Sequence, residues 1–221
     1  MNMTKILATA AAVALLPIAG SAATLSLTGG TVVGSVPANF GVLRDINGTV
    51  TAPADLTAPI TVYDDDDAVG TGLLATSVYG ARFTLTYIGY EAANVNNASS
   101  LSTGSASFST STSAYGDQIT FVQAPGVGLV DLVFSTLGGS GVSACTISNG
   151  NPFGGTCQVG FSSIFNAGGS TYAMFGDGLG DSDLDDIVFR VDVSEVPVPA
   201  AGFLLVGGLG AMAALRRRKK A

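Results

Sequence analysis

Apolar and polar residues alternate along many short stretches of the chain, and Gly, Asn, Pro and Asp separate these stretches. In one such stretch, Phe83, Leu85 and Tyr87 alternate with polar residues. Successive side chains of a strand point to opposite faces, so this period of two predicts a half-buried strand. The predicted strands are Thr24–Leu27, Ile60–Tyr63, Arg82–Tyr90, Ser105–Thr110, Gln118–Gln123, Leu129–Thr136, Val142–Ile147, Cys157–Phe165, Thr171–Phe175 and Ile187–Val193.

These strands predict the fold class. A strand with one apolar face must bury that face against another layer. About ten such strands predict an all-β ectodomain, built as a two-sheet sandwich or a jelly roll. A β-helix is the alternative, although the sequence shows no fixed repeat period. The 30 glycines and the hydrophobic share of 47% fit short strands joined by tight turns, because a disordered chain would be more polar.

The N-terminal segment differs from the rest of the chain. Lys5 precedes an apolar stretch from Ile6 to Ala19, and small residues follow. This order is typical of a secretory signal peptide, so we predict that residues 1–22 are removed by cleavage after Ala22 or Ala23. The alternative is a buried N-terminal helix.

The C-terminal segment contains a second apolar run, from Pro199 to Leu215. A helix of this length reaches about 26 Å, the short end of what spans a bilayer. It predicts a single transmembrane helix, with a core helix as the alternative. Five basic residues follow the run and would anchor its far end on the cytoplasmic side: Arg216, Arg217, Arg218, Lys219 and Lys220.

A proline motif stands at the start of this run and consists of Val196, Pro197, Val198, Pro199 and Ala200. Together with the apolar helix and the basic end, it resembles the PEP-CTERM class of bacterial sorting signals, in particular the Val-Pro-Leu-Pro-Ala (VPLPA-CTERM) variant. This chain has valine where the variant usually has leucine. The predicted organisation is a signal peptide (1–22), a β-sandwich ectodomain (23–195) and a sorting signal (196–221).

The resemblance implies a partner and a destination. In that family an exosortase-type membrane transpeptidase removes the helix and passes the ectodomain on. The expected localisation is therefore export, with a membrane-anchored precursor that moves to the cell surface or extracellular matrix of a Gram-negative bacterium. An extracellular polysaccharide is a candidate partner in that setting.

The amino-acid composition argues against several functional classes. The net charge is -7, and all 16 acidic residues lie in the predicted ectodomain. Nucleic acid is therefore not expected as a partner. The chain has no histidine, which excludes Ser-His-Asp and Cys-His catalysis and histidine-ligated zinc or haem.

The two cysteines are Cys145 and Cys157, and a loop rich in Asn and Gly separates them. Export would place them in an oxidising compartment, so we predict a disulfide across a hairpin. A pair of free, buried thiols is the alternative.

Two acidic clusters are candidate metal sites. Asp64 to Asp67 directly follow a predicted strand, and a second set precedes the last strand. Alternate Asp residues in a Gly-rich loop can offer several oxygens to Ca²⁺, which takes 6 to 8 oxygen ligands. The alternative is that both clusters are solvated loops that limit edge-strand aggregation. The predicted calcium ligands are Asp177, Asp181, Asp183, Asp185 and Asp186.

Three functional classes compete. The sequence favours a structural or interaction protein without catalytic residues. A carbohydrate-binding or Ca²⁺-dependent binding module is the second class, although such modules use exposed aromatic residues and the chain has no Trp and only six Tyr. A hydrolase that uses paired carboxylates is the third, because glycosidases need two acids and no histidine.

Overall fold

The structure is a computed structural model that describes residues 22–34, 41–56, 59–91, 94–100, 106–139, 141–178, 183–197, 207–210 and 212. The chain divides into two units. One unit is Ala22–Val196, and the other comprises Met1–Ser21 and Pro197–Ala221.

The described residues of the second unit are few. Residues 207–210 and 212, which fall inside the predicted membrane span, are helical. The remainder of that span and residues 1–21 of the predicted signal peptide lie outside the described residues. No helix in the described part of the chain is long and apolar enough to cross a membrane.

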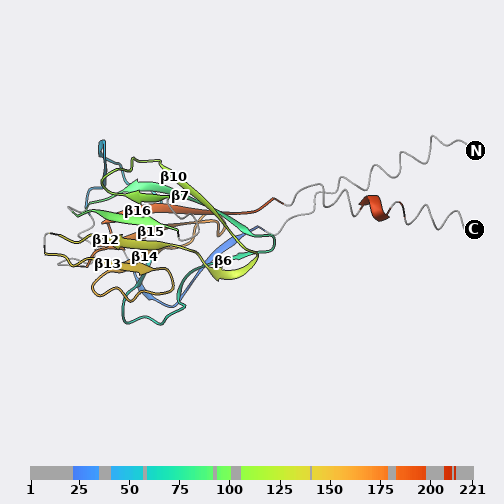
Figure 1. The fold of residues 1–221 in the computed structure, drawn as a ribbon, viewed down its shortest axis with the longest axis horizontal. Coiled ribbons are helices and arrows are strands. Elements are labelled where there is room, and N and C mark those ends of the chain that lie inside the picture. Colours follow the sequence, from blue (N-terminus) through green and yellow to red (C-terminus); the bar gives the residue numbers. More distant parts are fainter. Residues whose placement is uncertain are drawn as a thin grey trace, which may run out of the picture. The chain divides into compact units, whose positions relative to one another are not determined.

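Ala22–Val196 is all-β, and its described strands pair antiparallel. The largest sheet has seven strands, in the order β10 (Gln118–Gln123), β7 (Ala81–Gly89), β16 (Ile187–Glu195), β15 (Ser170–Gly176), β14 (Gln158–Ser162), β5 (Ile60–Tyr63) and β2 (Thr31–Val33). Figure 1 shows β10, β7 and β16 side by side.

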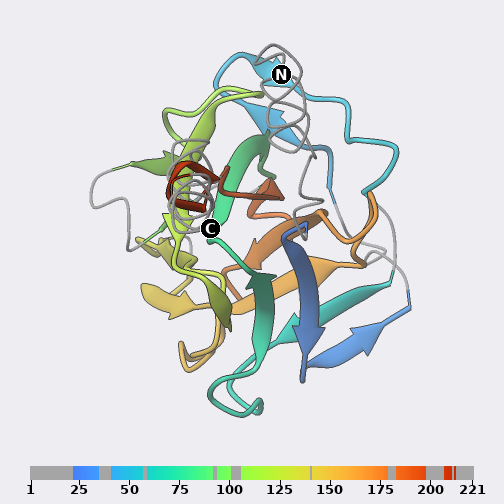
Figure 2. The ribbon, with the colours of Figure 1, turned by 90° about the vertical axis from the view of Figure 1, so that its right-hand side faces the viewer.

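Three smaller sheets complete this unit. A four-stranded sheet has the order β13 (Cys145–Ser148), β12 (Val133–Thr136), β8 (Asn96–Ser99) and β9 (Ser107–Ser109). A three-stranded sheet has the order β1 (Thr24–Thr28), β6 (Gly72–Ser77) and β11 (Gly126–Leu129). A short pair is formed by β3 (Arg44–Asp45) and β4 (Gly48–Thr49). Figure 2 shows β1 in dark blue next to β6 in teal.

The main core lies between the four-stranded and seven-stranded sheets. Phe108 of β9 contacts Tyr87 of β7 and Phe189 of β16, with ring centroids 5.4 and 5.7 Å apart. Phe134 of β12 stacks on Phe189 and on Phe175 of β15 at 5.6 and 5.7 Å. All five rings are buried. Since each buried aromatic side chain stabilises the fold by about 1.5–3 kcal/mol, these contacts hold the two sheets together.

The opposite face of the seven-stranded sheet, called here the outer face, carries a second, smaller core. Ile88 of β7 and Tyr172 and Met174 of β15 point to this side and pack with Leu43 and Leu184. The segment before β3, which contains Leu43, and the segment before β16, which contains Leu184, therefore cover part of the outer face. Alternate residues of each strand point away from the main core, and on the outer face these include Thr86 and Arg190.

The predicted all-β class is confirmed, and the alternation in β7 is as expected, since Phe83, Leu85 and Tyr87 are completely buried. One predicted strand, Leu129–Thr136, is wrong as a single element. Leu129 ends β11 and Val133 begins β12, and these two strands pair within different sheets. A continuous apolar run does not show where a chain leaves one sheet for another.

Candidate functional site

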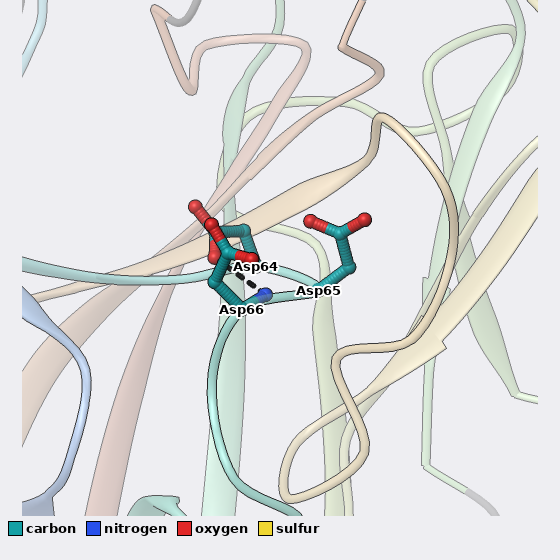
Figure 3. A group of neighbouring side chains, drawn as sticks. All are labelled: Asp64, Asp65 and Asp66. Carbon is teal, nitrogen blue, oxygen red and sulfur yellow. Dashed lines mark hydrogen bonds between the residues drawn. The ribbon is translucent and has the colours of Figure 1, made fainter.

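The two acidic clusters occupy different environments. The first lies in the turn after β5, where the backbone N–H of Asp66 donates to Asp64 Oδ1 at 3.1 Å and that of Asp64 donates to Asp67 Oδ2 at 3.1 Å. Asp64, Asp65 and Asp66 each offer an oxygen, and these oxygens lie within 4.8 Å of one another (Figure 3). Asp65 and Asp66 are exposed to solvent. This cluster is a solvated turn that can attract cations.

The second cluster lies between β15 and β16 and is buried. Its four described acids are Asp177, Asp183, Asp185 and Asp186, and none of them is more than 6% exposed. The prediction that both clusters could be solvated loops is therefore wrong for this one. Leu184 accounts for this burial. Its side chain packs in the core on the outer face, so the adjacent residues Asp183 and Asp185 are held against the protein. Asp181 lies outside the described residues.

The buried carboxylates connect separate segments of the chain. Asp186 Oδ2 accepts a hydrogen bond from the backbone N–H of Asp177 at 2.5 Å, and Asp177 Oδ2 accepts one from Asn94 Nδ2 at 2.9 Å. Asp185 Oδ2 accepts one from the backbone N–H of Gly41. A side chain on Gly41 would meet the side chains of Glu91 and Asp185, so glycine permits this close approach without moving them. The cluster thus fixes three loops to the start of β16.

Burial also changes the ionisation of this cluster. It raises the pKa of Asp185 and of Asp186 well above the usual value of a carboxyl, and the neighbouring acidic groups raise both further. The hydrogen bonds from the backbone N–H groups of Gly41 and Asp177 act in the opposite direction. A proton or a cation would therefore relieve the cost of burying these charges.

The four predicted calcium ligands that the structure describes do not form a converging group of carboxylates. Among the described residues, Asp64, Asp65 and Asp66 form the one group of three or more acidic or cysteine side chains whose ligand atoms converge closely enough to hold a metal ion. Asp185 Oδ1 is buried without a hydrogen-bond partner in the described part of the chain. Calcium binding between Asp177 and Asp186 stays a prediction.

Sequence patterns did not predict the amide side chains around the second cluster. Asn94 and Asn96 contact the loop from a distant part of the chain, and Asn96 Nδ2 donates to the carbonyl of Asp186 at 3.4 Å. Asn96 is completely buried on β8, a strand of polar sequence that alternation does not predict. Only the pairing of β8 with β9 and β12 places it there.

The predicted disulfide between Cys145 and Cys157 is confirmed. Its setting differs from the predicted hairpin. Cys145 begins β13 of the four-stranded sheet, and Cys157 directly precedes β14 of the seven-stranded sheet. The bond therefore joins two sheets across the main core, and Cys157 is completely buried.

The predicted sorting motif is described only at its start. The backbone N–H of Val196 donates to the carbonyl of Gly80 at 2.8 Å, directly after β16 ends at Glu195. Pro197 is the next described residue. Val198, Pro199, Ala200 and the five basic residues of 216–220 lie outside the described residues.

Comparisons with known proteins add no family to this geometry. No protein-family model, no curated protein and no solved structure matches the chain.

Proposed function

We propose that this chain is an exported bacterial protein of the cell surface or extracellular matrix, with a structural or interaction role and no catalytic one. The observation that carries the proposal is the order of four sequence features: an apolar N-terminal segment, an acidic β domain, the proline motif and an apolar run with a basic end. This order resembles the PEP-CTERM class of sorted proteins.

Two features of the β domain support this setting. The disulfide joins the two main sheets and is the kind of bond that persists in oxidising compartments. The domain is also strongly acidic, and such a charge keeps a secreted domain soluble. We also infer a two-sheet sandwich as the architecture, because the seven-stranded and four-stranded sheets share one aromatic core.

The proposed route uses each part of the C-terminal segment. The apolar run holds the precursor in the membrane, and Arg216–Lys220 keep its far end on the cytoplasmic side. Pro197 and Pro199 lack amide donors and favour extended backbone, so the motif can enter the cleft of an exosortase-type transpeptidase. Cleavage there would release the ectodomain to the surface.

Intact-mass analysis of protein extracted from the cell surface tests this route. The expected surface form ends in or next to Val196–Ala200 and lacks the signal peptide. Pro197→Ala combined with Pro199→Ala should leave export intact and block processing. As a matched control, Pro125→Ala in the ectodomain should be processed normally. A surface form that retains Phe203–Ala221 would contradict the sorting signal and indicate a simple membrane anchor.

A further inference from the structure

A cavity of about 520 Å³ opens on the outer face of the seven-stranded sheet. This volume lies within the usual range of small-molecule sites, about 300–1,000 Å³. It is separate from both acidic clusters and from the disulfide. Its walls come from the loop before β5, from the turn before β10 and from four neighbouring strands.

The floor of the cavity is a row of polar side chains on four adjacent strands. Gln118 of β10 pairs with Thr86 of β7, Thr86 pairs with Arg190 of β16, and Arg190 pairs with Tyr172 of β15. Residues directly opposite one another in a sheet lie on the same face. An amide, a hydroxyl, a guanidinium and a phenol therefore line one continuous surface on a rigid element.

Contacts within the cavity hold these groups in place. The Tyr172 hydroxyl donates to Asp55 Oδ1 at 2.6 Å, and Gln118 Nε2 donates to Thr86 Oγ1 at 3.3 Å. The Arg190 guanidinium donates to Asp192 Oδ1 at 2.9 Å and lies 5.5 Å from the centre of the Phe165 ring. Each of these polar groups has further donor or acceptor capacity, so a ligand can be recognised without rearranging the floor.

Tyr115 provides an aromatic surface at the rim. Its side chain is 54% exposed although it lines the cavity. Its backbone N–H donates to Asp45 Oδ2 at 2.9 Å, which ties the turn to the β3–β4 pair. This hydrogen bond is the main reason that the pKa of Asp45 lies below its usual value. The ring is therefore held by its backbone and left open to a ligand.

The charges of the cavity limit what it can bind. Asp55 and Asp192 are acidic, and Arg190, the one cation among the described lining residues, is paired with Asp192 at 2.8 Å. Anionic ligands would meet a net negative lining. A sugar ring fits better, because its hydroxyls both donate and accept hydrogen bonds and its C–H face can pack on an exposed aromatic ring.

We propose that this cavity binds a neutral saccharide unit of an extracellular polysaccharide. Tyr115 packs against the sugar ring, and Gln118, Asp55 and Arg190 hydrogen-bond to its hydroxyls. This inference rests on the proposed function for its extracellular setting and names the class of partner that the surface protein would hold.

Binding is measured with the full chain, purified in a zwitterionic detergent because many common detergents are themselves glycosides. The probes are a soluble β-glucan, a mannan and a galactan as neutral polysaccharides, the matching free disaccharides, alginate as a polyanion and polylysine as a polycation. Since the chain has no Trp, tyrosine fluorescence reports directly on its six Tyr residues. Saturable binding to a neutral polysaccharide is expected, with weak or no binding of alginate. The free disaccharides distinguish recognition of a single unit from recognition of the polymer.

Variants locate the binding site. Tyr115→Ala should weaken binding about ten-fold, the loss of one aromatic contact, whereas Tyr115→Phe should bind nearly normally and lose part of the fluorescence change. Gln118→Ala should weaken binding by about three-fold or more. Tyr79→Ala is the matched control, because Tyr79 is 41% exposed and does not line the cavity. Melting curves of all variants should match that of the unchanged chain.

The outcomes separate this inference from the proposed function. Absence of binding to all neutral probes, unchanged binding by a folded Tyr115→Ala variant, or binding of alginate or polylysine alone would overturn the saccharide site. None of these results would affect processing of the C-terminal segment. Cleavage of a bound polysaccharide would support the site and contradict the non-catalytic role.

Discussion

The two acidic clusters contain the same side chain but have opposite environments. Asp64 to Asp66 lie in a turn that points into solvent, whereas Asp177, Asp183, Asp185 and Asp186 are buried near Leu184, which is part of a core. The first set stays hydrated, whereas the buried charges of the second set must be neutralised or hydrogen-bonded. Clustering of acids in the sequence is therefore a poor guide to a site until burial is known.

The largest expected difference between the clusters is in their response to pH. The folded-state pKa values of Asp185 and Asp186 are raised from 3.8 to about 7 and about 8. Between the unfolded and folded values the folded state binds more protons, so the free energy of unfolding should fall as pH rises toward about 8. Urea unfolding at several pH values measures this slope.

Two matched double variants show which cluster causes this pH dependence of the free energy of unfolding. Asp185→Asn with Asp186→Asn should flatten it by removing the titrating groups, whereas Asp65→Asn with Asp66→Asn should leave it unchanged. Stability that rises steadily from pH 4 to pH 8 would show that the buried set is ionised at little cost.

Removal of a single carboxyl should also separate the clusters. Asp186→Ala, measured at about pH 5, should lower the free energy of unfolding by about 1–3 kcal/mol, because the buried N–H of Asp177 loses its acceptor. Asp65→Ala should change it by less than about 0.5 kcal/mol, as expected for an exposed turn residue. Equal effects on the urea midpoint would contradict the contrast in burial.

Calcium tests whether either cluster binds metal. If the buried set binds Ca²⁺ in the folded state alone, a calcium concentration ten times the Kd would add about 1.4 kcal/mol of stability. The melting temperature should then be higher in calcium than in EDTA at about pH 8, and Asp183→Asn should reduce the shift. A shift that Asp64→Asn abolishes and Asp183→Asn leaves intact would instead assign the metal to the exposed turn.

The smallest expected change in stability comes from relieving charge repulsion within the exposed turn. Asp65→Asn with Asp66→Asn should raise stability by a few tenths of a kcal/mol at low salt, because two neighbouring like charges are removed. The gain should vanish at about 1 M salt, where screening extends over only a few ångströms. Persistence of the gain at high salt would mean that the turn carries a steric or hydrogen-bonding cost as well.

Local sequence determined the elements that a residue pattern within one strand is enough to define. The alternation of Phe83, Leu85 and Tyr87 predicted β7, and the predicted bounds of Ile60–Tyr63 and Gln118–Gln123 are those of β5 and β10. The all-β class follows from such patterns, because a strand's period of two is a property of the backbone alone. The oxidised cysteine pair was also predictable from composition and expected export.

Tertiary structure decided which strands became neighbours, because hydrogen-bonded partners in a sheet are chosen over long sequence separations. It placed Cys145 and Cys157 on different sheets, buried Asn96 on a strand of polar residues and covered Asp185. It also aligned Gln118 and Tyr172, on β10 and β15, in one row across the outer face. No local pattern encodes that row, since its residues belong to four strands that only the pairing within the sheet brings together.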